Sequence, residues 1–205
     1  MSEFDFSSGA LCTDFANTWG NRADPSTERL AGYGDLLEWA QNAKILSASD
    51  LRELEGLANW EPARANGMLG VALELRDSVY RSCAAAAAGG TPSTSDIEWL
   101  NRVLSTIPSQ RLCCGGECCE WEWEPQQLDL DRVLWPIVRS AADILTSGDV
   151  GRLRECAAPD CTWLFVDRSR GKRRRWCDMS TCGNRAKARR YYERHRGSEG
   201  TIAGS

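Results

Sequence analysis

The sequence has few of the residues and motifs on which enzymes, membrane proteins and secreted proteins depend. Its 205 residues include a single histidine, and they contain no P-loop, no Rossmann glycine pattern and no nucleophile–base motif. No apolar run approaches the roughly 20 residues that cross a bilayer. The opening "MSEFDFSSGA" also lacks the apolar segment of a secretory signal. We therefore expect a cytoplasmic protein that is neither an enzyme nor bound to a membrane.

The composition is that of a folded chain with many thiols. Hydrophobic residues make up 42% of the sequence and nine residues are tryptophan, which argues against disorder. The length suits one or two domains, and we find no internal repeat and no long linker. In a reducing compartment, the ten cysteines are expected to be free thiols or metal ligands rather than disulfides.

Charge is distributed unevenly along the sequence. Residues 151–196 contain fourteen Lys and Arg and five acids, a net charge of +9, whereas residues 1–150 carry −12. The formal net charge of −4 hides this asymmetry. An acidic body with a basic end is typical of a regulator or adaptor that meets a polyanion, and a plain solvated tail is the simpler alternative.

Residues 1–150 have the pattern of a mostly helical domain. Apolar residues recur with the helical period in the segments 33–46, 47–60, 62–88, 96–107 and 131–148. Two helix starts carry capping-box patterns, Asp50 with Glu53 and Ser95 with Glu98. Pro136 is expected either in the first turn of its helix or at a kink.

One β-hairpin is predicted in this domain, by "RLCCGGECCEWEWE" at 111–124. With a three-residue turn, Cys114 faces Cys118 and Cys113 faces Cys119, which gives two pairs on opposite faces rather than a tetrad. Local packing is the default interpretation of these four cysteines. The alternative is a soft-metal site or a pair of oxidant-sensing thiols.

Four other cysteines have the spacing of metal ligands. Four residues separate Cys156 from Cys161 and Cys177 from Cys182, and fifteen residues separate the two pairs. Zinc takes four deprotonated soft ligands in a tetrahedron, so the pairs predict one structural Zn²⁺ rather than four ordinary buried cysteines. A redox pair is disfavoured because neither pair has the C-x-x-C spacing. A segment of about 45 residues buries little core, and a metal is the expected staple.

The residues around these ligands predict a treble-clef-like zinc finger with four cysteine ligands. "TWLFV" alternates like a strand, "DRSRGK" is typical of a turn, and "RRRWC" is expected to return as the second strand of a hairpin. A helix follows Cys182 as far as Arg196, and its apolar stripe is expected to pack on the zinc core and nearby aromatic residues. The stripe consists of Ala188, Tyr191, Tyr192 and His195, and its expected contacts are Trp163, Phe165 and Trp176.

Basic side chains of the turn and the helix are the candidate nucleic-acid contacts. Arginine and lysine bind phosphate oxygens, and arginine also reads base edges in the major groove. A zinc with four thiolates carries a net charge of −2, which leaves this region at about +7. The candidates are Arg168, Arg170, Lys172, Arg173, Arg174, Arg175, Arg185, Lys187, Arg189, Arg190 and Arg194.

The expected fold is mostly α (α+β) and has three regions. Residues 1–150 form a helical sensor or partner domain with a small hairpin, residues 151–197 form the zinc finger, and residues 198–205 form a disordered tail.

Residues 154–196 closely resemble the CGNR zinc-finger family, whose motif is Cys182-Gly183-Asn184-Arg185 here. The likeness includes all four cysteines, the Asp-x-Ser-Arg turn at 167–170, the segment 174–176 and the basic series of the helix. Upstream, "LCTDFANTW" (11–19) and "LWPIVRSAADILTSGD" (134–149) are similar to the ABATE domain of stress-induced transcription regulators. The resemblance covers nearly the whole chain, more loosely over the first 150 residues. It implies a bacterial protein whose finger binds DNA.

Three classes of function follow from these features. The first is a zinc-dependent DNA-binding regulator at the nucleoid, with duplex DNA as partner and an unknown small-molecule or protein effector on the helical domain. The second is a finger that binds RNA or an acidic protein surface, because aromatic residues interleaved with arginine also suit single strands. The third is an enzyme, which is disfavoured because hydrolysis needs an open metal position and a base. The oligomeric state and the DNA sequence stay open.

Overall fold

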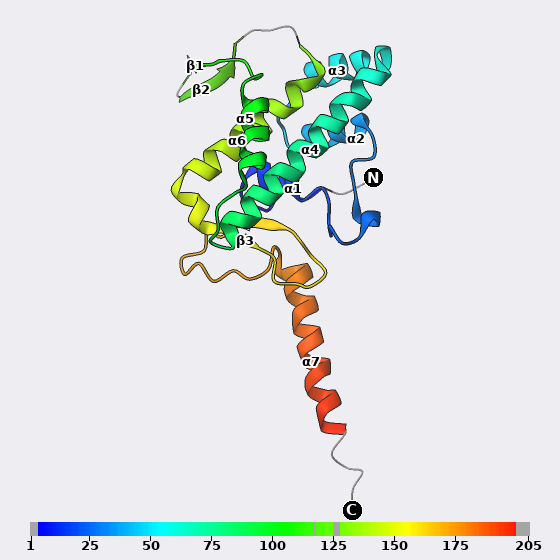
Figure 1. The fold of residues 1–205 in the computed structure, drawn as a ribbon, viewed down its shortest axis with the longest axis vertical. Coiled ribbons are helices and arrows are strands. Elements are labelled where there is room, and N and C mark those ends of the chain that lie inside the picture. Colours follow the sequence, from blue (N-terminus) through cyan, green and yellow to red (C-terminus); the bar gives the residue numbers. More distant parts are fainter. Residues whose placement is uncertain (1–3, 117, 125–127, 200–205) are drawn as a thin grey trace, which may run out of the picture.

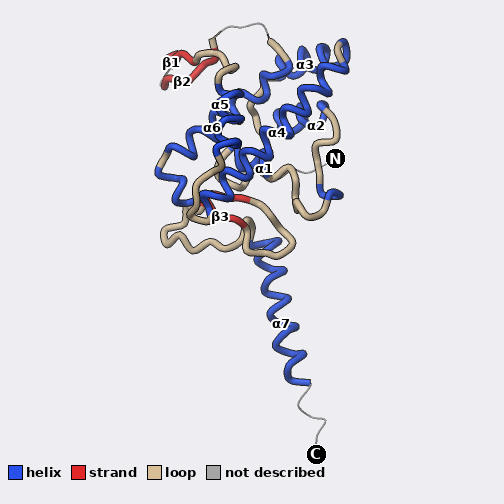
Figure 2. Tube along the Cα trace, in the orientation of Figure 1, coloured by secondary structure: helices blue, strands red, loops and turns tan. Residues whose placement is uncertain are grey.

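The computed structural model describes residues 4–116, 118–124 and 128–199 (Figure 1). The described part of the chain is mostly helical and includes two small two-stranded sheets (Figure 2). The predicted mostly helical fold with a small hairpin and a zinc finger is therefore confirmed.

The bounds of the elements are as follows. The helices are α1 Leu11–Ala16, α2 Tyr33–Asn42, α3 Ala48–Trp60, α4 Pro62–Ala87, α5 Thr94–Leu104, α6 Leu134–Thr146 and α7 Asn184–Glu199. The strands are β1 Gln110–Gly115, β2 Cys118–Trp123, β3 Leu153–Glu155 and β4 Leu164–Val166. Short 3₁₀ segments span Pro25–Thr27, Leu130–Val133 and Gly148–Arg152, and a π-helical turn spans Met179–Gly183.

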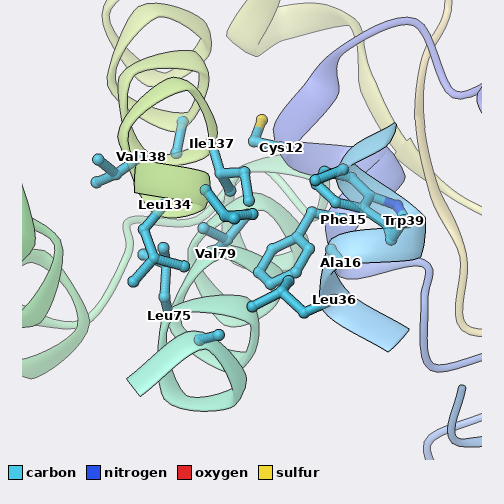
Figure 3. Packing of buried hydrophobic residues seen from close by; sticks show 14 of the residues in the cluster. Cys12, Phe15, Ala16, Leu36, Trp39, Leu75, Val79, Leu134, Ile137 and Val138 are labelled. Atoms are coloured by element: carbon cyan, nitrogen blue, oxygen red, sulfur yellow. The ribbon is translucent and has the colours of Figure 1, made fainter. Parts of the chain in front are cut away.

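The helical part of the chain before residue 151 is called the body below. Its core lies between α1, α2, α4 and α6 (Figure 3). Phe15 of α1 packs on Trp39 of α2 with their ring centroids 5.0 Å apart. Val79 of α4 and Ile137 of α6 are fully buried beside them. Each such side chain contributes about 1.5–3 kcal/mol by leaving water. The short helix α1 is stable because nearly all of its residues are buried.

The caps of α3 and α5 differ from the prediction. Helix α3 begins after Ser47, whose hydroxyl accepts from the Asp50 N–H at 3.1 Å. Helix α5 begins after Ser93, whose hydroxyl accepts from the Asp96 N–H at 3.1 Å. The predicted capping boxes are thus displaced by two or three residues. In both segments an earlier Ser-x-x-Asp pair has the same three-residue spacing and supplies the N-cap. Pro136 lies in the first turn of α6.

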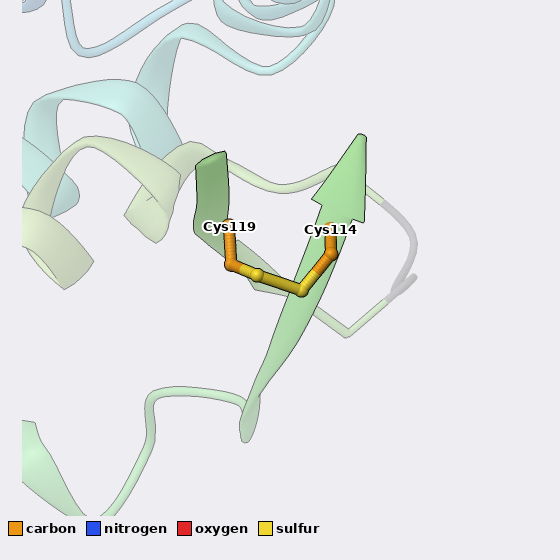
Figure 4. The surroundings of a disulfide bond; sticks show 2 residues. All are labelled: Cys114 and Cys119. Carbon is orange, nitrogen blue, oxygen red and sulfur yellow. A yellow bond between two sulfur atoms is a disulfide. The ribbon is translucent and has the colours of Figure 1, made fainter. Parts of the chain in front are cut away.

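The hairpin of β1 and β2 has a different register from the predicted one (Figure 4). Cys114 lies opposite Cys119, and the two form a disulfide. Gly115 lies opposite Cys118, so the turn has two residues rather than three. Gly116 has φ of +77°, a conformation that two-residue hairpin turns require and that glycine adopts without strain. The predicted Cys114–Cys118 and Cys113–Cys119 pairs are wrong, and so is the expectation of no disulfide, because the register brings Cys114 and Cys119 together. Cys113 and Cys118 are free thiols.

The second hairpin is also built from other strands than expected. Strand β4, predicted from "TWLFV", pairs antiparallel with β3, which precedes the first zinc-ligand pair. The segment 173–177 forms no strand and instead approaches that pair through one backbone bond, from the Ala157 N–H to the Arg175 carbonyl at 2.9 Å. Three residues of this hairpin, Leu153, Leu164 and Val166, belong to the core of the body. Burial of those side chains explains the choice of partner strand.

The hairpin of β1 and β2 and helix α7 lie at opposite ends of the molecule (Figure 1). Helix α7 extends away from the body and includes residues 198 and 199 of the predicted tail, whereas residues 200–205 lie outside the described residues. None of the helices among the described residues has the length and apolar character that a membrane span requires.

Candidate metal centre and nucleic-acid interface

The four predicted zinc ligands come together in one cluster. The sulfurs of Cys156, Cys161, Cys177 and Cys182 all lie within 4.8 Å of one another. The Cys161–Cys177 sulfur distance is 3.7 Å and the Cys177–Cys182 distance is 3.6 Å. Four thiolates at about 2.3 Å from zinc lie roughly 3.8 Å apart at the corners of a tetrahedron. The cluster therefore fits one tetrahedral zinc ion held by these cysteines.

Backbone and arginine donors contact two of the four sulfurs. Among the thiols themselves, hydrogen bonds from Cys161 and Cys177 lower the pKa of Cys156 to about 2, and the hydrogen bonds with Cys156 raise the pKa of Cys161 and Cys177. The backbone N–H of Cys177 also donates to the Cys156 sulfur at 3.4 Å. On the other side, Nη2 of Arg185 donates to the Cys182 sulfur at 3.1 Å. Such outer contacts orient zinc ligands and offset part of the thiolate charge.

Each residue of the Cys-Gly-Asn-Arg motif has a definite role at this centre. Cys182 supplies the fourth sulfur. A Cβ at Gly183 would lie 2.8 Å from the sulfur of Met179, so only glycine fits without displacing that side chain. The Asn184 amide donates to the Ser180 carbonyl at 3.0 Å and joins the π-helical turn to α7. Arg185 bridges the Cys182 sulfur and the Asp160 carboxylate, its Nη1 lying 3.0 Å from Oδ2.

The basic loop 168–175 is closed by the carboxylate of Asp167. Oδ1 accepts from the Ser169 N–H at 2.9 Å, and Oδ2 accepts from the Arg174 N–H at 2.9 Å. Burial acts to raise the pKa of Asp167, but the hydrogen bonds from Ser169 and Arg174 outweigh it and hold the pKa below its ordinary range. One ionised carboxylate thus fixes both ends of a loop in which most side chains are basic.

The apolar stripe of α7 does not pack as predicted. Tyr191 and Tyr192 are 52% and 67% exposed, and Ala188 and His195 are exposed as well. The His195 ring stacks on the Tyr191 ring at 4.0 Å rather than on the zinc core. The helix leaves the body after its first turns, so the body does not cover this stripe (Figure 1). The face directed at the finger instead carries Ala186, which is half-buried.

The predicted nucleic-acid contacts fall into two groups. Three of them contact other parts of the protein. Arg174 donates to the carbonyls of Trp176 and Cys177 and lies over the Phe165 ring at 4.5 Å. Arg168 donates to the Gly9 carbonyl at 3.3 Å, and Arg185 holds the zinc cluster. Arg168 and Arg185 are nevertheless exposed, and so are the other eight: Arg170, Lys172, Arg173, Arg175, Lys187, Arg189, Arg190 and Arg194.

Known families account for both parts of the chain. Residues 9–148 match the ABATE family, whose description is "Putative stress-induced transcription regulator". Residues 152–195 match the CGNR zinc finger. The chain belongs to the ABATE family and carries a CGNR zinc finger. No curated protein matches the chain. The expected architecture is confirmed, and neither family is a family of enzymes.

The body holds the CGNR finger through Ser8 and through Asn17 of the "LCTDFANTW" stretch. The Asn17 amide donates to the Leu164 carbonyl at 2.9 Å and accepts from the Leu164 N–H at 2.8 Å. The Ser8 carbonyl accepts from the Val166 N–H at 2.7 Å. Asn17 therefore makes the pair of hydrogen bonds to the backbone of β4 that a residue of a neighbouring strand would make. Sequence reasoning missed this role, because the spacing of a single asparagine does not reveal a partner 147 residues away.

Asp14, three residues before Asn17, is a buried acid in this contact region. Its Oδ1 accepts from the Ser8 N–H at 3.0 Å. Burial raises the pKa of Asp14 to about 6, although the hydrogen bonds from Ser8 act in the opposite direction. The carboxyl group thus helps to position the segment that pairs with β4. Because its pKa is raised, it stays protonated at a higher pH than an ordinary aspartate does.

The chemistry available at the zinc centre is structural. Four cysteine ligands complete a tetrahedron and leave no position for water or substrate. The single histidine of the sequence lies on α7 among exposed residues and away from the ligands. The centre therefore holds the first ligand pair, the basic loop and the start of α7 in a fixed arrangement.

Proposed function

We propose that this protein is a zinc-dependent, DNA-binding transcription regulator whose finger contacts duplex DNA while the body responds to a ligand or protein partner. The observation that carries the proposal is the exposure of ten basic side chains on two elements that the zinc cluster brings together. The loop 168–175 supplies five of them and α7 supplies the other five. Like charges held this close repel one another, and a polyanion relieves that repulsion.

Helix α7 has the dimensions of a major-groove reader. An α-helix with its side chains is about 10–12 Å wide, and the major groove of B-DNA is about 12 Å wide. Lys187, Arg190 and Arg194 share one face of α7, spaced three and four residues apart. In this arrangement the helix face meets base edges and phosphates, and the loop lies on the flanking backbone.

The three internally paired arginines support the surface rather than contact DNA in this proposal. Arg174 fixes the end of the loop on the finger core, and Arg185 fixes the first turn of α7 on Cys182. Arg168 joins the start of the loop to the body, with Asp149 at 3.4 Å. Removing any of them disturbs the position of the other exposed basic side chains.

The affinity should depend strongly on salt. If the finger neutralises six phosphates, the logarithm of the binding constant falls against the logarithm of the salt concentration with a slope of about −5. A slope near zero, or equal affinity for unrelated duplexes at physiological salt, would contradict specific regulation.

A cavity of about 650 Å³ at the junction of body and finger is the candidate effector site. Its volume is within the range of about 300–1,000 Å³ found for small-molecule sites. Glu28 and Arg29 line it from the body, and Trp163, Cys182 and Arg185 line it from the finger. A ligand that contacts both walls would couple its binding to the position of α7. Substituting Ser26→Trp at the cavity should abolish a ligand response while DNA binding persists.

The decisive experiment selects genomic DNA fragments with the purified, zinc-loaded protein, with and without a chelator. Enrichment of a defined set of fragments that is lost with zinc removal is the expected result. Cys182→Ser should behave like the chelated protein, and Cys118→Ser, which alters the distant hairpin, is the matched control. If no fragment is enriched, or enrichment is indifferent to zinc, the DNA proposal is wrong.

The alternative function is an RNA- or protein-binding zinc module without a direct role in transcription. The observation in its favour is the exposure of Tyr191 and Tyr192 among the arginines of α7. Competition between duplex DNA and structured RNA at equal concentration separates the two. We expect duplex DNA to win, and the protein to occur at the nucleoid.

A further inference from the structure

A second, smaller cavity lies within the basic surface itself. Its volume is about 210 Å³, and it opens between the first ligand pair, the end of the basic loop and α7. The residues that matter here are Pro159, Arg175, Trp176, Ala186, Arg189 and Arg190, which all line it. The cavity is smaller than the roughly 300 Å³ at which sites for drug-sized ligands begin. It therefore suits one planar ring system.

Trp176 is the aromatic wall of this cavity. Its indole is half-buried because one part packs against the finger core, while the rest lines the cavity. The backbone carbonyl of Trp176 accepts from Nε of Arg174 at 3.0 Å, so the ring stands on an anchored segment. A fixed aromatic face of this kind stacks on planar ligands at a small cost in side-chain entropy.

Two cationic side chains lie next to the indole of Trp176. The guanidinium carbon of Arg175 lies 5.3 Å from the ring centroid, and that of Arg190 lies 5.8 Å from it. Both side chains are long and exposed, so they can move aside at small cost. Their charges then remain next to anything that stacks on the ring.

The electrostatics of the cavity favour an anionic ligand. Four arginines line it, at positions 175, 185, 189 and 190, against two acids, Asp160 and Glu193. Asp160 is engaged by Arg185 at 3.0 Å. The surplus positive charge stands at the rim, where α7 and the loop meet. A planar aromatic group with a phosphate on either side satisfies both the ring and the arginines.

We propose that this cavity takes a single unpaired nucleotide, with its base on Trp176 and its flanking phosphates on Arg175, Arg189 and Arg190. A base inside a duplex has both faces stacked and cannot reach an aromatic wall. An extruded, bulged or single-stranded base exposes its face. The inference rests on the proposed function in that the finger faces nucleic acid, and it adds that the finger distinguishes unpaired from paired positions.

The experiment uses the zinc-loaded full chain and 2-aminopurine as a fluorescent base. Three probes carry it in one sequence context: a fully paired duplex, a duplex with 2-aminopurine as a one-nucleotide bulge, and a single strand. The free deoxynucleotide monophosphate is the fourth probe and tests whether a mononucleotide is also accepted. Stacking quenches the fluorescence of 2-aminopurine. Binding should therefore lower the fluorescence of the bulged probe, which is high in the free probe.

The variant that tests the ring is Trp176→Leu, which keeps an apolar group against the finger core. We expect it to weaken binding of the bulged probe by roughly 5- to 150-fold, the contribution of one base–aromatic stack, and to leave the paired duplex within about twofold. Trp60→Leu is the matched control, because Trp60 is 83% exposed on the distant helix α3. Trp176→Phe retains a stacking face and should keep most of the preference. Zinc content checks that each variant folds.

The outcomes separate this inference from the proposed function. If the bulged probe stays bright on binding, or if Trp176→Leu weakens paired and bulged probes equally, the nucleotide cavity is wrong while duplex binding stands. If Trp176→Leu loses its zinc, quenching by the unaltered protein and by Trp176→Phe decides the matter. If the paired duplex is not bound at all, the regulator proposal fails, and quenching of the single strand or of the mononucleotide still supports the cavity.

Discussion

The protein holds two groups of four cysteines, and they behave differently. In the hairpin, Cys113, Cys114, Cys118 and Cys119 fall on two paired strands, where adjacent side chains point to opposite faces. Only one cross-strand pair meets, and it forms a disulfide. In the finger, the four sulfurs come from two irregular turns and converge within 4.8 Å. The number of thiols is the same, so the backbone geometry decides whether a tetrad can form.

The two groups also differ in their attachment to the body. The finger shares core residues with the body and is held by both hydrogen bonds of Asn17. The β1–β2 hairpin has largely exposed side chains, and its Trp123 reaches the Trp135 ring of α6 at 5.7 Å. Disturbing the finger should therefore affect the whole protein, whereas disturbing the hairpin should affect little else.

The largest expected effect comes from removing a zinc ligand. Cys182→Ser should abolish stoichiometric zinc binding and unfold the two ligand turns, the basic loop and the start of α7, because zinc binding contributes on the order of 10 kcal/mol to such small modules. Strands β3 and β4 should stay folded on the core of the body. Zinc content and hydrogen exchange of the finger measure this. Cys118→Ser should keep one zinc per chain. Equal loss of zinc in both variants would show that the finger cysteines are not the specific zinc ligands.

A smaller effect is expected from cutting the attachment of the finger. Asn17→Ala leaves the N–H and carbonyl of Leu164 buried without these partners, which should lower the free energy of unfolding by about 3 kcal/mol. Urea denaturation measures the change, and zinc content should be preserved. Asn42→Ala is the matched control, since Asn42 is exposed and its amide donates within α2 at 2.8 Å. Similar losses in both variants would argue against Asn17 as the anchor.

The pH dependence of stability gives a third test at the same attachment. Because burial raises the pKa of Asp14 to about 6, the folded state binds this proton more tightly than the unfolded state. The free energy of unfolding should therefore fall as pH rises between about 4 and 6 and level off above. From pH 5 to 7 the contribution is about 1 kcal/mol.

Asp14→Asn keeps the acceptor for Ser8 and should remove this contribution, so the variant gains stability relative to the parent protein as pH rises. Urea denaturation of both proteins at pH 5 and pH 7 gives the change in the free energy of unfolding between the two pH values. Subtracting the change in the variant from the change in the parent cancels the contribution of the other titrating groups. Asp143→Asn, on the exposed face of α6, is the control. The same pH profile for the parent and Asp14→Asn would mean that Asp14 is ionised normally.

The smallest expected effect is on the hairpin. Replacing both Cys114 and Cys119 by serine should change the free energy of unfolding by about 0.5 kcal/mol or less, because the hairpin is peripheral and largely exposed. Hydrogen exchange within residues 110–123 should nevertheless rise. Zinc content and DNA affinity should not change. A loss of DNA binding on reduction of this disulfide would show that the two cysteine groups communicate.

The predictions from sequence succeeded where a local pattern decides the structure. The long helix from Pro62 and the clustering of the four cysteines into one zinc site were correct because helical periodicity and ligand spacing are properties of short segments. The Ser47 and Ser93 caps were missed by a few residues because several serines and acids met the same rule. The register of the β1–β2 hairpin was wrong because two- and three-residue turns both suit a Gly-Gly pair.

The stripe of α7 shows the limit of such reasoning most directly. Periodicity correctly groups Ala188, Tyr191, Tyr192 and His195 on one face, but it does not say which surface lies opposite. In the structure, the body occupies the other side of the finger because β4 pairs with β3 and Asn17. The helix is then directed away from the body, and the stripe stays exposed.

What the sequence by itself determined is the local chemistry: the helices, the four thiolates for one zinc and the basic loop and helix that follow from them. Only the tertiary structure decided which of these surfaces are free. It packed Arg174 on the finger core, left the other ten candidate basic side chains exposed, and put Trp176 beside a cavity between the loop and α7. The physical reason is that spacing along the chain sets direction within one element, whereas exposure depends on contacts between residues far apart in sequence.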